Sequence, residues 1–219
     1  VRGNVVRVQT SIEPVTVQAP IAVKKMEGPV PEGFSYYFIF KITPQEGAPS
    51  VTGSGGSVSV NVTSAGEIEA SGYNKTGFGS AKFTYPGTYE YLIQEVIPDI
   101  CAPYISYDAS VYKWTVNVSA VAGDDGIDKL VATSTLTKIK DSEGNDITPV
   151  TCEKPVFVNK YKTVEITGEK TWEDADNQDG VRPDSITVNL LADGEKVESV
   201  EISADTEWKY SFTNLPEYT

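Results

Sequence analysis

The sequence predicts an all-β protein built from β-sandwich domains in tandem. Apolar and polar residues alternate over many short stretches, most clearly over 112–120, as expected of strands with one buried face. Turn signals such as Pro86-Gly87 and Asp125-Gly126 separate these stretches. No stretch shows a helical period of apolar residues. Short strands with frequent turns are typical of Ig-like sandwiches.

Composition excludes several classes of function. The chain has 219 residues and a net charge of −13, which argues against nucleic acid and anionic membranes as partners. Histidine is absent, so the commonest general base and neutral metal ligand are missing. The sequence contains no run of about 20 apolar residues, which a membrane-spanning helix would need. We expect no cofactor and no metal site.

The order of the predicted elements indicates three regions. Residues 1–19 alternate only weakly and contain Pro14, so we expect an extended N-terminal arm, with a short strand within it as the alternative. A first sandwich is predicted over 20–162, with strands at 21–26, 36–42, 58–62, 83–85, 88–96, 112–120, 130–139 and 156–161. Residues 44–57, 64–80 and 98–110 are predicted as loops.

A partial second sandwich is predicted over 163–219. Its strands are expected at 164–172, 186–190, 197–202 and 208–212, which are too few for a closed sandwich. The acidic stretch 173–184 has some features of a calcium loop, but Ser185 stands where an EF-hand requires glutamate. A solvated acidic turn is the favoured interpretation.

Three polar residues fall on the apolar faces of predicted strands. In 21–26, Lys25 shares a face with Ile21 and Val23, whereas Lys24 is expected to reach water. Glu95 and Asn159 occupy similar positions in a middle strand and in the last strand. A buried lysine is costly unless its charge is neutralised or consumed. A strand end or a buried ion pair is the simpler alternative for each residue alone.

Together these side chains supply an amine, a proton-carrying carboxyl and a carboxamide. Burial would lower the pKa of the Lys25 amine and raise that of Glu95, which could then donate to the Asn159 carbonyl. Attack of the amine would release ammonia and leave a Lys–Asn isopeptide bond. Such a reaction needs the high effective molarity of a fixed, dry site. We therefore expect a self-catalysed cross-link between Lys25 and Asn159.

Two cysteines, Cys101 and Cys152, lie outside any C-x-x-C pair, so zinc and thioredoxin-type sites have no support. A disulfide between them is one interpretation if the protein is exported. Two reduced thiols are the other.

The first unit resembles the isopeptide-linked domain of Gram-positive, streptococcal-type backbone pilins. The matching stretches are Ala22-Val23-Lys24-Lys25, Phe38-Ile39-Phe40-Lys41-Ile42, Pro86 to Glu95, Ile105-Ser106-Tyr107-Asp108, Tyr112 to Val116 and Phe157-Val158-Asn159-Lys160. The resemblance implies a bond from Lys25 to Asn159 with Glu95 as the catalytic residue. The cysteine pair is not part of the family pattern.

The second unit resembles the start of a collagen-adhesin B-type domain. The matching stretches are Val164 to Trp172, Gly180-Val181-Arg182-Pro183, Ile186 to Leu191, Trp208 to Phe212 and Asn214-Leu215-Pro216. Lys170 matches the cross-linking lysine of such domains, and its partner would lie beyond Thr219.

These resemblances imply a structural subunit of a surface pilus that sortase joins to other pilin subunits. Lys154 is a candidate sortase acceptor, with Lys160 and Lys162 as competitors. The expected location is extracellular, anchored to the cell wall, without membrane insertion in this segment. The alternative is an adhesin or stalk protein that is not polymerised and binds a host ligand. An enzyme with turnover is not expected, because no open site with a nucleophile and a base can be assembled without histidine; the self-cross-linking is a single turnover.

Overall fold

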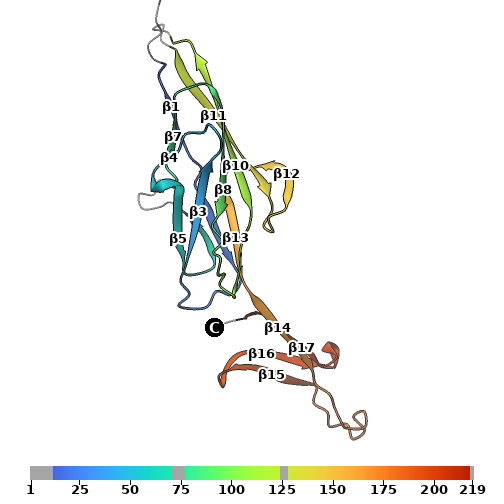
Figure 1. Ribbon diagram of the computed structural model, residues 1–219. Helices are drawn as coiled ribbons and strands as arrows, with labels where there is room; N and C mark the ends of the chain where they lie inside the picture. Colours follow the sequence, from blue (N-terminus) through green and yellow to red (C-terminus); the bar gives the residue numbers. More distant parts are fainter. Residues whose placement is uncertain (1–11, 71–76, 124–127, 218–219) are drawn as a thin grey trace, which may run out of the picture.

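The computed structural model describes residues 12–70, 77–123 and 128–217, and the predicted all-β class is confirmed (Figure 1). The strands of the first unit are β1 (Val15–Gln18), β2 (Val23–Glu27), β3 (Tyr36–Pro44), β4 (Val51–Thr52), β5 (Ser57–Val62), β6 (Gly66–Glu69), β7 (Ser80–Phe83), β8 (Gly87–Glu95), β9 (Ile105–Ser106), β10 (Val111–Val121), β11 (Lys129–Lys140), β12 (Asp146–Thr151) and β13 (Val156–Tyr161). The second unit holds β14 (Thr163–Glu169), β15 (Ser185–Ala192), β16 (Glu195–Ser203) and β17 (Lys209–Pro216). Two 3₁₀ turns, η1 (Ser54–Gly56) and η2 (Ala204–Thr206), interrupt the strands.

The first unit is an Ig-like sandwich of two main sheets. One sheet has the strand order β12-β11-β10-β8-β3-β5 and the other the order β6-β2-β13-β9. Aromatic rings join the two layers, because Phe157 of β13 lies 5.0 Å from Phe40 of β3 and 5.2 Å from Tyr112 of β10, centroid to centroid. The alternation in β3, β8 and β10 places one apolar face of each strand in this core.

The first and last strands of this sandwich are direct neighbours. β2 pairs with β13 in parallel, and β6 covers the other edge of β2. Because β2 is interior to its sheet, its backbone is paired on both sides. This arrangement brings two segments that are far apart in the sequence into one ladder.

Part of the predicted N-terminal arm belongs to the fold. Val15 to Gln18 pair with β7 in a small sheet of order β1-β7-β4. The remainder of the predicted arm, residues 1–11, lies outside the described residues.

The structure also contains short strands that alternation did not predict. β4, β6 and β9 fall within the predicted loops 44–57, 64–80 and 98–110, and β12 follows the turn at 141–145. Their side chains are mostly exposed, so they lack the one-sided apolar pattern that marks the longer strands. Conversely, β14 ends at Glu169 and does not reach Trp172.

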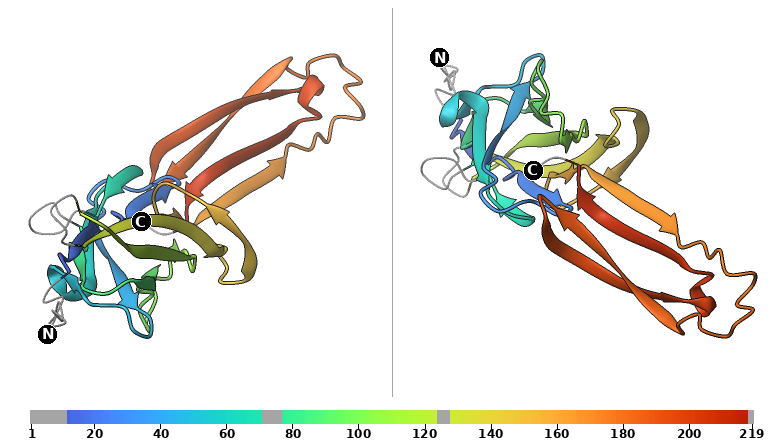
Figure 2. Two further views of the ribbon diagram at one scale, coloured as in Figure 1. Left: turned by 90° about the horizontal axis from the view of Figure 1, so that it is seen from above. Right: turned by 90° about the horizontal axis from the view of Figure 1, so that it is seen from below.

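The second unit consists of two separate antiparallel pairs, β14 with β17 and β15 with β16. Figures 1 and 2 both show this unit extending from one end of the first unit. Its fully buried apolar side chains, among the residues described, are Ile202 and Phe212. No helix in the described part of the chain is long and apolar enough to cross a membrane.

Candidate functional site

The inward-facing lysine of β2 is Lys24, and the prediction for Lys25 is wrong. The Lys24 side chain is fully buried, whereas the Lys25 side chain is 38% exposed and its Nζ lies 2.9 Å from Glu27 Oε1. The register with β13 explains the error. Lys24 lies opposite Phe157 and so shares the face of Phe157 and Asn159, whereas Lys25 lies opposite Val158 on the other face.

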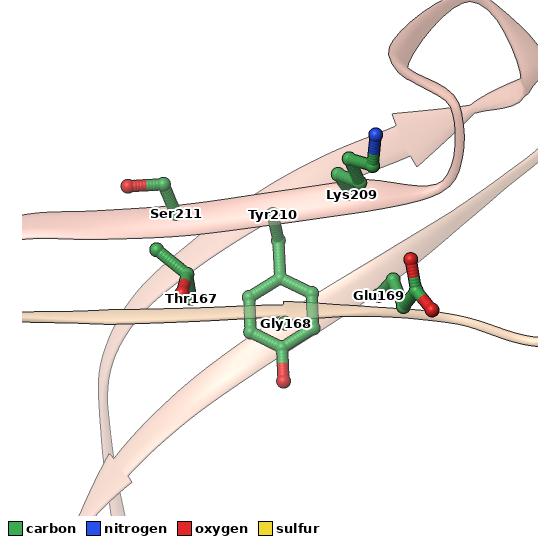
Figure 3. Close-up of a pocket in the computed structure, with 6 residues that line it drawn as sticks. All are labelled: Thr167, Gly168, Glu169, Lys209, Tyr210 and Ser211. Atoms are coloured by element: carbon green, nitrogen blue, oxygen red, sulfur yellow. The ribbon is translucent and has the colours of Figure 1, made fainter.

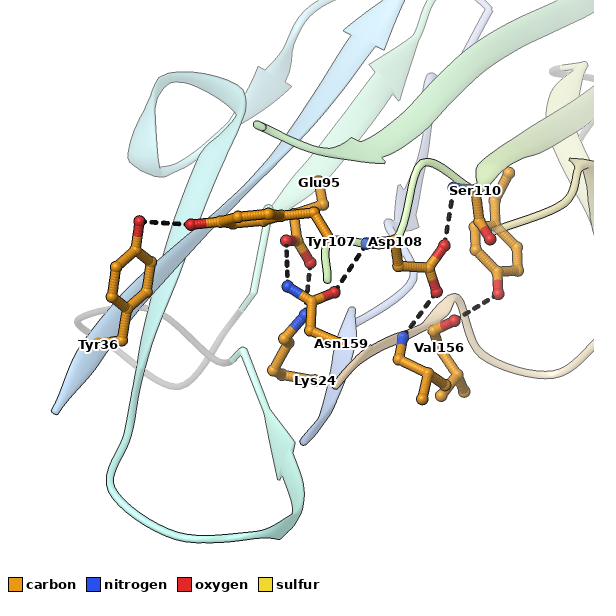
Figure 4. Close-up of polar contacts among 10 residues, drawn as sticks. Lys24, Tyr36, Glu95, Tyr107, Asp108, Ser110, Val156 and Asn159 are labelled. Atoms are coloured by element: carbon orange, nitrogen blue, oxygen red, sulfur yellow. Dashed lines mark hydrogen bonds and ion pairs between the residues drawn. The ribbon is translucent and has the colours of Figure 1, made fainter. Parts of the chain in front are cut away.

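Glu95 joins Lys24 and Asn159 from the opposite sheet. Lys24 Nζ donates to Glu95 Oε2 over 2.6 Å, and Asn159 Nδ2 donates to Oε1 over 2.7 Å (Figure 4). Each oxygen of one buried carboxylate thus holds one of the two nitrogen groups. Glu95 is the last residue of β8 and lies on the same buried face as Tyr91 and Ile93. The structure therefore brings an amine, a carboxyl and a carboxamide together, with Lys24 in place of Lys25.

Burial sets the electrostatics of this cluster. It lowers the pKa of the Lys24 amine to about 8, against the opposing effect of Glu95. It also raises the pKa of the Glu95 carboxyl, although Lys24 and the Asn159 amide act in the other direction. Both shifts favour the uncharged forms, so transfer of the shared proton from amine to carboxylate costs less here than in water.

Aromatic rings enclose the cluster. Lys24 Nζ lies 4.2 Å from the centroid of the Phe38 ring, and Phe38 in turn packs edge-on against Tyr107 at 6.3 Å. The Tyr107 hydroxyl is hydrogen-bonded to that of Tyr36 over 2.7 Å. These contacts exclude water from the amine, which is what the lowered pKa reflects.

A further contact of the site comes from Asp108, for which the sequence predicts no role. The main-chain N–H of Asp108 donates to Asn159 Oδ1 over 2.9 Å, so the carbonyl partner of Asn159 is Asp108 and not Glu95 as predicted. With Oδ1 bound by a donor and Nδ2 bound by an acceptor, the orientation of the amide is determined. A backbone donor leaves no side-chain signature in a sequence, although Asp108 lay in one of the stretches that carried the family resemblance.

The two cysteines are free thiols, so the disulfide considered for them is not formed. Cys101 is exposed, with its Sγ directed at the carbonyl of Pro98 over 3.3 Å. Cys152 lies against β11, with its Sγ 3.7 Å from the carbonyl oxygen of Leu136.

The candidate sortase acceptor Lys154 is exposed and lies between β12 and β13. Its Nζ forms an ion pair with Glu69 of β6, which raises the pKa of the lysine. The competitor Lys160 lies on β13 with its Nζ 3.8 Å from Glu27 Oε2. Position and exposure leave both amines accessible.

Lys170 of the second unit lies at the end of β14 and is exposed. Its Nζ lies 4.4 Å from the centroid of the Trp172 ring. In the adjacent acidic loop, Arg182 forms a two-pronged ion pair with Asp174, with distances of 2.7 and 2.9 Å. This pairing joins the two ends of the loop through partly buried side chains.

A shallow hollow of about 520 Å³ lies on the β14–β17 pair (Figure 3). It is lined by Thr167, Gly168, Glu169, Lys209, Tyr210 and Ser211. The Tyr210 ring lies directly over Gly168, where a Cβ would meet its hydroxyl at 2.4 Å. The hollow is a surface feature of aromatic packing over a glycine and is remote from the buried cluster. Across the described ranges, no group of three His, Cys, Asp or Glu side chains is arranged to hold a metal ion.

Family models match both units. The model described as Spy0128-like isopeptide containing domain matches residues 20–162, and the Cna protein B-type domain model matches residues 166–219. Both resemblances inferred from the sequence are thereby confirmed.

Individual relatives are similar over different parts of the chain. The collagen adhesin of Staphylococcus aureus is 54% identical over 65 residues, which cover 29% of this chain and 6% of that protein. The major pilin protein T-13 of Streptococcus pyogenes is 18% identical with a TM-score of 0.46, covering 94% of this chain and 80% of that one. A single B repeat unit of the collagen-binding surface protein of S. aureus is 18% identical with a TM-score of 0.26, at 94% and 80% coverage. Since the first family model accounts for more than half of its residues, the chain belongs to the family of Spy0128-like isopeptide containing domains.

Proposed function

We propose that the first unit cross-links itself through an isopeptide bond between Lys24 and Asn159, with Glu95 as the proton relay. The observation that carries this proposal is the placement of one buried carboxylate on both reacting groups, at 2.6 and 2.7 Å. A carboxylate in that position can take a proton from the amine and give one to the leaving nitrogen without moving far.

The reaction proceeds in balanced steps. The Lys24 ammonium transfers a proton to Glu95 Oε2, leaving a neutral amine and a neutral acid. Nζ attacks Asn159 Cγ, and the negative charge gathers on Oδ1. Glu95 donates its proton to Nδ2, and its carboxylate then takes a second proton from the attacking Nζ. The Cγ–Nδ2 bond breaks as the charge on Oδ1 returns to the carbonyl. One ammonia leaves for each amide bond formed, and the Lys24 charge disappears from the core.

The mass of the intact protein tests this bond. Wild-type protein should be lighter than its sequence mass by one ammonia. Lys24→Arg and Asn159→Ala should show the full sequence mass, and Glu95→Ala should lose ammonia far more slowly because it lacks the relay. Lys25→Arg is the matched control and should behave as wild type. A Lys25→Arg protein of full mass, or a Lys24→Arg protein that still loses ammonia, contradicts the assignment.

At the level of the whole protein, we propose a pilin- or adhesin-type surface protein whose first unit acts as a structural module of a Gram-positive pilus. The family of the first unit and the B-type domain that follows it support this role. In this proposal the chain lies outside the cell, anchored to the wall, and sortase joins it to other pilin subunits. The reaction at Lys24 is a single self-modification and not enzyme turnover.

Lys154 is the proposed sortase acceptor, because it is exposed and lies just before the last strand. Covalent pilin polymers should run as a ladder of bands in wall extracts, and Lys154→Arg in cells should abolish that ladder while keeping the positive charge beside Glu69. Lys160→Arg is the control and should leave the ladder intact. A ladder that survives Lys154→Arg refutes this acceptor.

A second candidate is an adhesin that is not polymerised, favoured by the 54% identity of 65 residues to a collagen adhesin. Because that match covers 6% of the relative, ligand binding is a proposal for this chain. Saturable binding of purified protein to a host matrix component, in a strain that forms no polymers, would favour it over the pilus subunit.

A further inference from the structure

Asp108 is a buried carboxylate that the steps above do not use. Its side chain is 1% exposed. It lies in the connection between β9 and β10, next to Asn159 of the site. Oδ1 accepts from the main-chain N–H of Ser110 over 2.8 Å (Figure 4). Oδ2 accepts from the main-chain N–H of Val158 over 2.6 Å. A buried acid held by two backbone donors fixes the local course of the chain.

The consequence of this anchoring is the direction of the main-chain N–H of Asp108. That N–H donates to Asn159 Oδ1 at 2.9 Å. Oδ1 is the atom on which negative charge develops when Nζ attacks Cγ. Donors placed about 2.7–3.1 Å from a developing oxyanion in a water-excluded site contribute strongly to catalysis.

The contact from Val158 ties the donor to its target. Val158 precedes Asn159 on β13. The Asp108 carboxylate therefore contacts both its own loop, at Ser110, and the strand that carries the Asn159 carboxamide. The carboxylate therefore sets the distance between the N–H group and Oδ1 from both sides.

We propose that the main-chain N–H of Asp108 is the oxyanion donor of the cross-linking reaction, and that the Asp108 carboxylate is its positioning group. The inference rests on the proposed Lys24–Asn159 bond. It gives a role to the hydrogen bond from the Asp108 N–H to Asn159 Oδ1, the third polar contact of the site beside the two made by Glu95.

Replacing the amide at residue 108 by an ester tests the donor directly, since an ester keeps the carboxylate and removes the N–H. Cys101 and Cys152 flank this position, so the full chain can be assembled by ligation of three segments, 1–100, 101–151 and 152–219. Folding is started from denaturant, and loss of ammonia is followed by intact mass. The ester at 108 should slow the reaction by about 100-fold or more.

The matched control is an ester at Glu143 in the same synthetic segment. Its N–H donates to Asp141 Oδ1 over 3.0 Å in an exposed turn and does not touch Asn159. This control should react at the wild-type rate. If the ester at 108 also reacts at that rate, the inference is overturned while the cross-link stands. If the all-amide chain loses no ammonia, the proposed function itself falls.

Side-chain variants provide a second measurement if the ester chain does not fold. Asp108→Asn keeps one acceptor for two backbone donors and Asp108→Ala keeps none, so the rate should fall in that order, with Asp108→Ala about tenfold or more below wild type. The groups facing Lys24 are the Glu95 carboxyl, the Asp108 carboxylate, the neutral Asn159 amide and the Phe38 ring.

Asp108 raises the pKa of both Lys24 and Glu95. Asp108→Asn should therefore also move the pH dependence of the reaction to lower pH, which a general loss of stability would not do. Unchanged rates and an unchanged pH profile in both variants would overturn the inference.

Discussion

At the scale of single residues, the site contains ionisable side chains whose burial is costly. Lys24, Glu95 and Asp108 are all buried, and buried charges destabilise a fold unless they are paired or removed. Asp108 is satisfied by two backbone donors. Lys24 and Glu95 form an ion pair with each other. The proposed reaction converts them to an amide and a neutral acid. The cost of burial and the drive toward the reaction therefore have the same origin.

The pH dependence of the cross-linking rate follows from the protons held by this pair. The reactive form, amine with neutral acid, contains one shared proton. Above about pH 8, the pKa of Lys24, the pair loses that proton and Glu95 cannot protonate the leaving group. Below the pKa of Glu95, which burial raises above its usual 4.5, the pair holds a second proton and the amine stays charged.

The expected rate profile is thus bell-shaped. It can be measured by jumping unreacted, refolding protein to different pH values and quenching in acid for intact mass. A rate that keeps rising well above pH 8 would contradict the relay role of Glu95, because it would mean that amine deprotonation alone limits the reaction.

At the scale of strands, alternation predicted the elements that have one buried face. β3, β8 and β10 bury every second residue, and their sequences show it. The strand at β2 is predicted from the sequence, but with the wrong face inward, because the β-branched Val23 suggests that its own face is the core side. Val23 and Lys24 are both buried, since β2 is an interior strand covered on both faces near its start. In such a strand the type of the apolar residue does not reveal which face holds the site.

The rest of the site could be predicted from side chains only in part. Glu95 and Asn159 were identifiable because each is polar on an otherwise apolar strand face. The contribution of Asp108 depends on the position of its backbone N–H, which the loop between β9 and β10 sets. β9 and β12 were missed for a related reason, since backbone pairing at a sheet edge holds them with few buried side chains.

The junction of β4 and β7 depends on a glycine. Gly79 has φ +86, and a Cβ there would meet the carbonyl oxygen of Thr52 at 1.7 Å. Its own carbonyl accepts the N–H of Ala19 over 2.9 Å. Gly79→Ala should therefore destabilise the first unit by about 3 kcal/mol or more, through both clash and backbone strain.

Urea unfolding in a Lys24→Arg background, where no cross-link forms, measures this loss. Gly47→Ala is the control, because Gly47 has φ +79 but no atom within 4 Å of a Cβ; it should cost about 1–2 kcal/mol. Equal losses for the two variants would show that the close approach to Thr52 has no energetic effect.

At the scale of the whole molecule, the two units differ in how they are held together. The first unit buries a continuous aromatic core, whereas the second unit, over its described residues, buries Ile202 and Phe212 and exposes Leu191 and Val197. Limited trypsin digestion should therefore cut after lysines of the second unit, such as Lys196, while the first unit persists as one fragment. Early cleavage within β3 or β10 would contradict this order.

The proposed cross-link also determines how the first unit carries tension. After β1, the path of the chain through the two main sheets begins at β2 and ends at β13, and these strands are parallel neighbours. A bond from Lys24 to Asn159 gives force a covalent path that bypasses the 135 residue steps between them (159 − 24). By the loop-entropy model for disulfides, such a closure also stabilises the unit by about 5 kcal/mol.

Pulling single molecules from a residue between β1 and β2 and from a residue after β13 tests this consequence. Wild-type protein should show no unfolding step from the first unit. Lys24→Arg should extend in a step approaching the contour length of the released residues, roughly 45 nm at about 3.4 Å each. Lys25→Arg should match wild type, because its side chain lies on the outer face beside Glu27. A full-length step in wild-type protein would mean that the load passes through hydrogen bonds alone, and that β2 and β13 are paired but not covalently joined.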